Sequence, residues 1–277
     1  MEMQTVNKLI QLALDEDIGS GDITTDNLID PHLGGSGVLI AKEPLVLAGI
    51  DIAGRVFHHL DPAIEFQALL SDGDTADTGD TLAHIRGNLA ALLKGERTAL
   101  NFLQRLSGIA THVASYMKLM EGTSVRLVDT RKTTPGWRVL DKYAVRVGGA
   151  RNHRMGLYDG VLIKDNHIAA FGGIAGAIAH IRKHVSHLVK IEVETSTPAQ
   201  VEEALQAGAD VIMLDNMSLE DIKTAVEIIR HAALVEVSGN VTRARLPDLA
   251  ATGVDIISVG ALTHGARSVD ISMKISV

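Results

Sequence analysis

Cysteine is absent from the 277-residue chain. Its absence excludes disulfide bonds, a cysteine nucleophile and thiolate metal ligands, and it is consistent with a reducing compartment such as the cytoplasm. Aromatic residues make up only 3% of the chain, although hydrophobic residues as a whole make up 46%. The core must therefore consist mainly of Ala, Val, Ile and Leu, which suits the close packing of helices on a sheet in α/β proteins.

Long hydrophobic runs are also missing. No uncharged stretch reaches the roughly 18 apolar residues that a membrane-spanning helix requires, so we expect no membrane partner. The first residues include Glu2, Asp15 and Glu16 and no long apolar run, unlike a signal peptide. Together with the lack of cysteine, these features predict a cytoplasmic protein.

Two common phosphate-binding signatures, the Walker A loop and Gly-x-Gly-x-x-Gly, do not occur. The formal net charge of -8 argues against a nucleic-acid partner. Positive charge is nevertheless concentrated between residues 131 and 164, where eight Lys or Arg residues face only Asp141 and Asp159. A basic segment in an acidic chain indicates a small substrate that carries several negative charges.

Hydrophobic periodicity predicts an N-terminal domain over residues 1–112. A helical pattern over 6–14 precedes four short strand-like runs, at 37–41, 45–48, 64–70 and 81–86. Two longer helical patterns follow at 89–106 and 109–120. Residues 268–277 alternate like a strand, and we expect this strand to join the sheet of the first domain.

After residue 122, strand-like and helical segments alternate. This rhythm predicts a parallel sheet closed as a barrel, and fewer than eight strands predict that the barrel over 113–267 is incomplete. The expected strands are 125–129, 160–164, 189–194, 211–214, 235–237 and 256–259.

Polar or glycine-rich residues follow each expected barrel strand. Active sites of parallel barrels lie at the carboxyl ends of the strands, so these clusters predict the position of the site. Glycine and serine turns before helices are suited to binding phosphate through backbone N–H groups. The clusters are 129–132, 164–167, 194–195, 215–216, 238–240 and 260–264.

Glu194 and Asp215 follow apolar runs of β-branched residues. Each could hold a Mg²⁺ that bridges pyrophosphate oxygens, or each could pair with a neighbouring Lys or Arg. Lys164 could bind an anion or form a Schiff base, as in barrel aldolases, and the many cations nearby favour anion binding. For Glu194 and Asp215, the residues alone favour neither the metal site nor the ion pair.

Arg131, Lys132 and Arg154 are the strongest candidates for recognising an anion. Arginine binds a carboxylate through two parallel hydrogen bonds, whereas lysine acts as a point charge. The alternative is a solvated basic face, but Pro135-Gly136 and Gly148-Gly149 divide the segment into short structured pieces.

Two patterns resemble metal sites only weakly. His180, His184 and His187 lack a carboxylate in register, so a surface cluster at a helix end is expected. Asp72 to Asp77 suggests a calcium loop, but residue 83, where the loop's glutamate belongs, is Ala. A hairpin turn is therefore the better interpretation.

Ten motifs, in order along nearly the whole chain, resemble the quinolinate phosphoribosyltransferase family. Any one of them is weak evidence, but their ordered combination is specific. They are Gly21–Thr25, Glu96–Asn101, Asp129–Gly136, Lys142–Arg146, Asn152–Arg154, Gly156–Asp159, Ile163–Ile168, Met213–Asn216, Val237–Asn240 and Ser258–Ala261.

This resemblance implies an N-terminal α/β sandwich domain and a C-terminal incomplete α/β barrel. It implies a homodimer with active sites shared between subunits, which could assemble further. The implied reaction joins quinolinate and phosphoribosyl pyrophosphate, with Mg²⁺, to give nicotinate mononucleotide, pyrophosphate and carbon dioxide.

The resemblance also implies residue roles. Arg131, His153, Arg154 and Lys164 are expected to hold the quinolinate carboxylates, with Arg97 reaching in from the partner subunit. The other expected substrate contacts serve the pyrophosphate, ribose, metal and 5′-phosphate. They are Thr130, Lys132, Glu194, Asp215, Ser238, Gly239, Asn240, Gly260 and His264. Lys132, Glu194 and Asp215 are also expected to be catalytic, together with Lys164. Glu194 and Asp215 are expected to bind the metal directly or through water.

Other functions fit parts of the sequence. A Schiff-base lyase would use Lys164, and a non-catalytic protein could bind phosphoribosyl pyrophosphate without turnover. A paralogous group associated with molybdenum-transport gene clusters lacks the full Asn-His-Arg and Ile-Lys-Asp-Asn-His patterns. Both patterns are intact here, at 152–154 and 163–167, which favours the biosynthetic enzyme.

Overall fold

The computed structural model describes residues 3–277, which form two compact units. The first unit contains the chain up to Ala114, together with Thr133–Gly149 and Leu262–Val277. The second contains Ser115–Lys132 and Ala150–Ala261. The sequence prediction assigned 133–149 to the barrel; in the structure these residues make their contacts with the first unit, where the Trp137 ring stacks on Phe102 at 4.8 Å.

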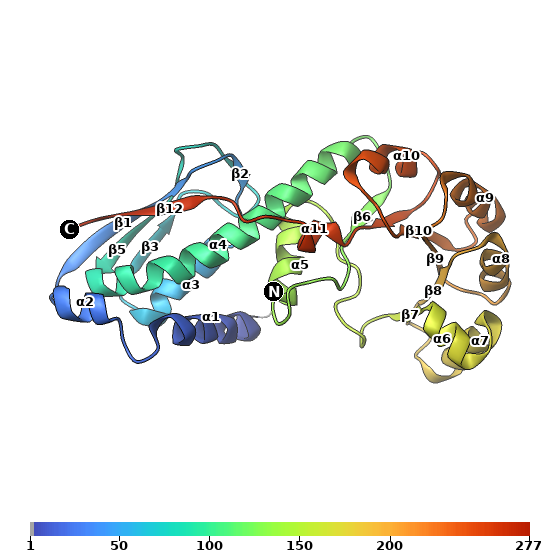
Figure 1. Cartoon of the computed structure of the whole chain (residues 1–277), viewed down its shortest axis with the longest axis horizontal. Helices are drawn as coiled ribbons and strands as arrows, with labels where there is room; N and C mark the ends of the chain where they lie inside the picture. Colours follow the sequence, from blue (N-terminus) through green and yellow to red (C-terminus); the bar gives the residue numbers. More distant parts are fainter. Residues whose placement is uncertain (1–2) are drawn as a thin grey trace. The chain divides into compact units, whose positions relative to one another are not determined.

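The first unit is built on a four-stranded sheet in the order β12-β1-β5-β3 (Figure 1). Every neighbouring pair is antiparallel, and buried residues alternate with less buried ones along β1 from Ser36 to Ala41. Its strands are β1 (Gly34–Ala41), β3 (Glu65–Ala68), β5 (Thr81–Asn88) and β12 (Ile271–Ser276), and β2 (Leu45–Val46) pairs with β4 (Thr75–Ala76). Its helices are α1 (Met3–Ile18), α2 (Ile23–Leu28), α3 (Ile50–Leu60), α5 (Arg138–Val147) and most of α4 (Leu89–Met117).

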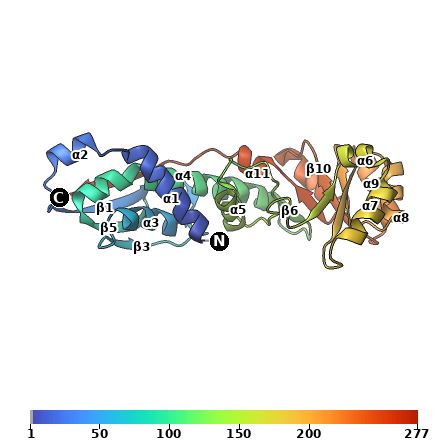
Figure 2. The ribbon, with the colours of Figure 1, turned by 90° about the horizontal axis from the view of Figure 1, so that it is seen from below.

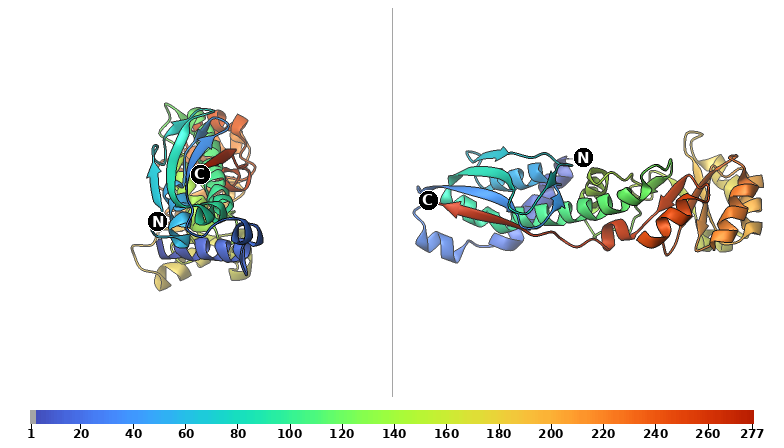
Figure 3. Two further views of the ribbon diagram at one scale, coloured as in Figure 1. Left: turned by 90° about the vertical axis from the view of Figure 1, so that its left-hand side faces the viewer. Right: turned by 90° about the horizontal axis from the view of Figure 1, so that it is seen from above.

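The last strand returns to the first sheet. β12 pairs with β1 from Ser36 opposite Ser276 to Ala41 opposite Ile271. Figure 3 shows the two strands side by side although they lie at opposite ends of the sequence. Ile271 and Met273 are buried on this strand, so the alternation seen in the sequence is the alternation of core and solvent faces.

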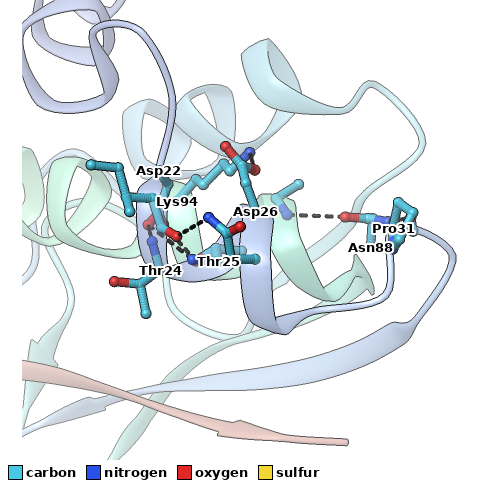
Figure 4. A network of polar contacts seen from close by, with 10 residues as sticks. Asp22, Thr24, Thr25, Asp26, Pro31, Asn88 and Lys94 are labelled. Atoms are coloured by element: carbon cyan, nitrogen blue, oxygen red, sulfur yellow. Dashed lines mark hydrogen bonds and ion pairs between the residues drawn. The ribbon is translucent and has the colours of Figure 1, made fainter.

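The Gly21–Thr25 motif forms the start of α2 (Figure 4). Asp22 caps the helix, because its Oδ1 accepts the backbone N–H groups of Thr24 and Thr25 at 3.0 Å. The Lys94 ammonium on α4 then pairs with Asp26 at 2.5 Å. The motif therefore caps α2, and the adjacent Asp26 joins this helix to α4.

The turn around Asp72 also has a structural role. The Asp72 carboxylate accepts the backbone N–H groups of Gly49 and Ile50 at 2.8 and 3.0 Å, at the start of α3, and the Tyr143 hydroxyl at 2.5 Å. In a calcium loop the Asp72 carboxylate would bind the ion. Here it binds backbone and side-chain donors of the protein, in agreement with the expected turn.

α4 is one continuous helix, although its sequence predicted two. The two predicted patterns, 89–106 and 109–120, lie on either side of Ser107-Gly108, and glycine is unfavourable inside a helix. The backbone of the 267–268 segment passes over Gly108 so closely that a Cβ there would lie 2.1 Å from the Arg267 carbonyl oxygen. Gly108 therefore permits a close crossing of two backbones and does not end the helix.

The second unit contains six parallel strands in the order β6-β11-β10-β9-β8-β7. β6 and β7 lie at the two edges of the sheet and do not pair with each other, which confirms the incomplete barrel. The strands are β6 (Arg126–Val128), β7 (Val161–Ile163), β8 (Ile191–Thr195), β9 (Val211–Asp215), β10 (Leu234–Ser238) and β11 (Ile256–Ser258).

Helices cover the outer face of this sheet, as Figures 1 and 2 show for α7, α8 and α9. α8 begins as the sequence predicts, with Thr197 as N-cap and Pro198 in the first turn. The helices are α6 (Asp165–Phe171), α7 (Ile174–His184), α8 (Pro198–Gln206), α9 (Leu219–Ile229), α10 (Leu246–Ala250) and the short α11 (Ala261–His264), which crosses the boundary between the units. None of the helices among residues 3–277 is long and apolar enough to cross a membrane.

Gly108→Ala tests the backbone crossing. Alanine favours a helix by up to about 1 kcal/mol over glycine, but here its methyl group would meet backbone atoms that cannot rotate away. We expect a net loss of about 1–3 kcal/mol in the free energy of unfolding, measured by chemical denaturation. The control is Gly176→Ala in α7, whose Cβ would meet only the half-exposed Phe171 ring at 3.1 Å and should cost nothing. Equal stability of the two variants would contradict the crossing.

Candidate functional site

One face of the parallel sheet carries polar side chains. In the strand register, Glu194 lies opposite Met213, Met213 lies opposite Glu236, and Asp215 lies opposite Ser238. Paired residues and every second residue along a strand point to the same face, so these side chains share the face away from the covering helices. The strand ends therefore bring Glu194, Asp215 and Ser238 to the same side of the sheet, as the sequence predicted.

Lys164 follows β7 and lies beside Glu194. The Lys164 ammonium is 2.7 Å from Glu194 Oε2, and the two side chains are 45% and 16% exposed. This contact with a carboxylate suits a lysine that acts as a cation, which is the anion-binding role favoured by the sequence. It also shows that Glu194 has a cation partner within the protein.

The loop after β6 carries three of the predicted residues. Thr130 Oγ1 accepts the backbone N–H of Lys132 at 3.1 Å, which fixes the turn between them. The Arg131 and Lys132 side chains are exposed, as an anion-binding loop requires.

Arg154 lies close enough to Arg131 for their charges to repel. Burial lowers the pKa of Arg154, and the charge of Arg131 lowers it further. The Gly160 carbonyl accepts a hydrogen bond from Arg154 Nη1 at 2.9 Å, which holds the guanidinium in this position. Two guanidinium groups held together against repulsion form a site that an anion would stabilise.

The turns after β9 and β10 support each other. Asn240 Nδ2 donates to Asn216 Oδ1 at 3.0 Å, and Asn216 Nδ2 donates to Asp215 Oδ2 at 2.7 Å. Gly239 has a φ of +86°, and a Cβ there would lie 2.3 Å from Asn216 Oδ1. Glycine is therefore required at 239. Asn216, which the sequence analysis placed in a strand-end cluster without a role, joins the two turns.

The remaining predicted residues lie on other elements. Gly260 follows β11 in the second unit. Arg97 on α4 and His264 at the end of α11 belong to the first unit, and both side chains are exposed. His180 and His184 have ring centroids 4.4 Å apart on the exposed end of α7, in agreement with a surface cluster.

His153 points into a buried pair of carboxylates that the sequence analysis missed. Its Nε2 lies 3.1 Å from Glu192 Oε2 and 3.6 Å from Glu236 Oε1. Glu192 and Glu236 are 8% and 1% exposed. The available signal was a glutamate within each apolar strand run, two residues before the strand-end Glu194 and Ser238.

The pKa of Glu236 is raised to about 7, first by burial and second by the charge of the neighbouring Glu192, whereas His153 and Ser258 act in the opposite direction. Two carboxylates this close cannot both ionise without a large electrostatic cost. The buried pair therefore retains a proton at pH values where an exposed glutamate has lost its own.

Asp129 anchors the segment that contains His153. The carboxylate, which is fully buried at the end of β6, accepts the His153 backbone N–H at 2.9 Å and the Asn152 side-chain amide at 2.6 Å. Arg151 forms a single parallel bridge with Val128 on β6. Residues 151–153 thus lie along the free edge of β6.

Glu194 and Asp215 provide the oxygen ligands that suit Mg²⁺. Magnesium in phosphate-transfer sites is commonly bound by one or two carboxylates, with waters and substrate phosphates completing its shell. The two carboxylates lie at the carboxyl ends of neighbouring strands, on one face of the sheet, and neither is fully buried. The donor set fits the metal, although Glu194 would exchange its contact with Lys164 for the ion.

Both parts of the chain match known domains. Residues 22–107 match the N-terminal domain of quinolinate phosphoribosyl transferase, and residues 109–274 match its C-terminal domain. The chain belongs to the quinolinate phosphoribosyltransferase family. The family match covers both the antiparallel sheet and the parallel strands that carry the site.

Individual members of the family are similar over nearly the whole chain. A probable nicotinate-nucleotide pyrophosphorylase [carboxylating] from Synechocystis is 46% identical, with 98% of this chain and 92% of that protein covered. The protein of the same name from Bacillus subtilis is 43% identical, covering 98% and 94%. The crystal structure of NadC from Streptococcus pyogenes superposes with a TM-score of 0.96 at 42% identity, covering 100% and 98%.

Glu236→Gln tests the buried carboxylate pair. The folded-state pKa, about 7, lies above the ordinary glutamate value of 4.5. The contribution of the Glu236 proton to the free energy of unfolding is therefore complete below pH 4.5 and is lost as the pH rises through 7. Glutamine cannot ionise, so the variant should gain stability relative to the parent between pH 5 and pH 8, by up to about 3 kcal/mol.

The measurement is urea denaturation at both pH values, with Glu227→Gln on the exposed face of α9 as the control. A difference between variant and parent that does not change with pH would show that the pair does not hold the extra proton.

Proposed function

We propose that the protein transfers the phosphoribosyl group of phosphoribosyl pyrophosphate to quinolinate, with loss of carbon dioxide, to give nicotinate mononucleotide and pyrophosphate. The supporting observation is that a member of this family carries the neighbouring cations Arg131 and Arg154, the Lys164–Glu194 pair and Asp215 at the strand ends of one parallel sheet. The arrangement supplies positive charge for a dicarboxylate and carboxylates for a metal-bound pyrophosphate.

Quinolinate carries two adjacent carboxylates, and the neighbouring cations can neutralise their negative charge. In this proposal Arg131, Arg154 and Lys164 bind the carboxylates, since guanidinium groups match carboxylate geometry and Lys164 adds a point charge. The resemblance also assigns His153 to this group. Both of its ring nitrogens contact protein groups, so a direct contact between His153 and the substrate stays a prediction.

Phosphoribosyl pyrophosphate is assigned to the remaining strand ends. Lys132 and Thr130 serve the pyrophosphate, together with the metal carboxylates. Backbone N–H groups of turns and glycine-rich loops are suited to the 5′-phosphate. The residues proposed for that end are Ser238, Gly239, Asn240, Gly260 and His264.

The chemistry requires no covalent intermediate with the protein. The ring nitrogen of quinolinate attacks the anomeric carbon, and the bond to pyrophosphate breaks as positive charge develops on the ribose. Fixed cations stabilise the leaving pyrophosphate, and preorganised charge of this kind is usually the largest catalytic contribution. The bond between the alkylated, cationic ring and the adjacent carboxylate then breaks, carbon dioxide leaves, and its bonding electron pair stays on the ring carbon. That carbon takes up a proton from water to give nicotinate mononucleotide.

Mg²⁺ is proposed to bind at Glu194 and Asp215, where it would neutralise charge on the pyrophosphate. Glu194→Gln and Asp215→Asn should each raise the Mg²⁺ concentration for half-maximal activity by about tenfold or more, because each removes a charged ligand. Glu202→Gln, on the exposed side of α8, is the control. Unchanged Mg²⁺ dependence in both variants would place the ion elsewhere.

The activity itself is tested with purified protein, quinolinate, phosphoribosyl pyrophosphate and Mg²⁺. We expect nicotinate mononucleotide by mass and an equal amount of carbon dioxide, with no product when nicotinate replaces quinolinate. Binding of both substrates without turnover would instead support a non-catalytic phosphoribosyl pyrophosphate-binding protein.

A homodimer with shared sites is proposed from the family resemblance, with Arg97 acting on the quinolinate of the partner subunit. Mixing Arg97→Ala subunits with Lys164→Ala subunits should restore about a quarter of the parental activity, because one site in a mixed dimer then has both groups intact. No recovery in heterodimers confirmed by mass would refute the shared site.

A cytoplasmic location is proposed from the absence of cysteine in the sequence. Fractionation of the source cells tests it, and recovery of the protein in an oxidising compartment would contradict it.

A further inference from the structure

We propose that Glu192, Glu236 and Asp129 act as positioning residues, which hold His153 in its Nε2–H tautomer and thereby fix the backbone of Arg154 in the quinolinate pocket. The assignment of the pocket rests on the proposed function; the tautomer and the contacts of His153 do not.

The His153 tautomer follows from its neighbours. The Arg154 backbone N–H lies 2.8 Å from His153 Nδ1, and a backbone N–H can only donate, so Nδ1 accepts and carries no proton. The ring proton is therefore on Nε2, which faces Glu192 Oε2 at 3.1 Å and Glu236 Oε1 at 3.6 Å. Asp129 holds the His153 backbone, so the residue is fixed at its main chain and at both ring nitrogens.

The same three side chains could also be interpreted as a metal site. The ligand atoms of His153, Glu192 and Glu236 lie within 4.8 Å of one another, and one oxygen of each buried glutamate has no hydrogen-bond partner. A histidine that binds a metal through Nε2 carries its proton on Nδ1 and donates it to an acceptor. Here Nδ1 faces a donor, so the geometry favours a hydrogen-bonded cluster over a metal ion.

The cluster acts on the site through Arg154. His153 Nδ1 orients the Arg154 backbone, and the Gly160 carbonyl holds its guanidinium at 2.9 Å. The charge of Arg131 opposes this position of Arg154, whereas the charges of Glu192 and Asp159 favour it. Loss of the Glu192 acceptor for His153 Nε2–H would release the ring and loosen the Arg154 backbone.

The tautomer is measured directly by NMR of protein labelled with ¹⁵N-histidine, with the His153 signals assigned by their loss in His153→Gln. We expect long-range ¹H–¹⁵N correlations of the Nε2–H tautomer in the protein without substrates. The Nδ1–H tautomer, a doubly protonated ring, or zinc bound in one-to-one ratio by elemental analysis would each overturn the proposal. None of these readouts depends on activity.

The positioning role is measured with Glu236→Leu and Glu236→Gln. Leucine removes the carboxyl group that hydrogen-bonds to Glu192, the acceptor at 3.1 Å for His153 Nε2–H. We expect its KM for quinolinate to rise about tenfold or more, with the KM for phosphoribosyl pyrophosphate changed less than about threefold. Glutamine keeps an amide that can donate to Glu192, so it should restore the quinolinate KM to within about threefold of the parent. Equal quinolinate KM values for the two variants, or equal rises for both substrates, would overturn the role.

Quinolinate binding by calorimetry separates the two hypotheses. If the parent shows the Nε2–H tautomer but binds no quinolinate, the proposed function fails while the tautomer assignment stands. If the parent binds quinolinate and Glu236→Leu binds it as tightly as Glu236→Gln, the positioning role fails while the proposed function stands.

Discussion

The candidate site depends most on the hydrogen bonds that the fully buried Asp129 carboxylate accepts from Asn152 and His153. A parallel sheet that stops short of closure leaves an edge strand with unpaired backbone groups, and such an edge must be covered. Here residues 151–153 lie along the edge of β6, held by a single bridge at Arg151 and by the hydrogen bonds of Asp129. His153 and Arg154 therefore lie at the open edge of the incomplete barrel.

Charge within the second unit is arranged in layers along the strands. Glu192 and Glu236 are buried within the sheet, whereas Glu194 and Asp215 lie at the strand ends and are more exposed. Burial raises the pKa of Glu236, which favours a shared proton between this carboxylate and its neighbour. The outer carboxylates are better placed to bind a metal ion, for which Glu194 would exchange its contact with Lys164. Carboxylates buried within the sheet therefore support the site, and in our proposal the carboxylates at the strand ends bind the metal.

The sequence predicted the parts of the fold that depend on periodicity. All six parallel strands lie within two residues of the predicted bounds, and Lys164, Glu194 and Asp215 lie at the carboxyl ends of three of them, as the apolar runs placed them. Gly108 was misleading, because a glycine that permits a close backbone crossing has the same letter as one that ends a helix. α3 was missed as well, since its pattern lies among short strands and its N-terminus is stabilised by Asp72, 22 residues further along the chain.

The roles of Asp129, Glu192 and Glu236 could not be derived from the sequence for a related reason. Each depends on residues from distant strands that meet inside the sheet, and no local spacing records that meeting. The most direct test of the whole account is a crystal structure with quinolinate bound. We predict the dicarboxylate on the inner face of the parallel sheet, in contact with Arg131, Arg154 and Lys164, with His153 still directed at Glu192 and Glu236. A ligand bound away from those three cations would contradict the account.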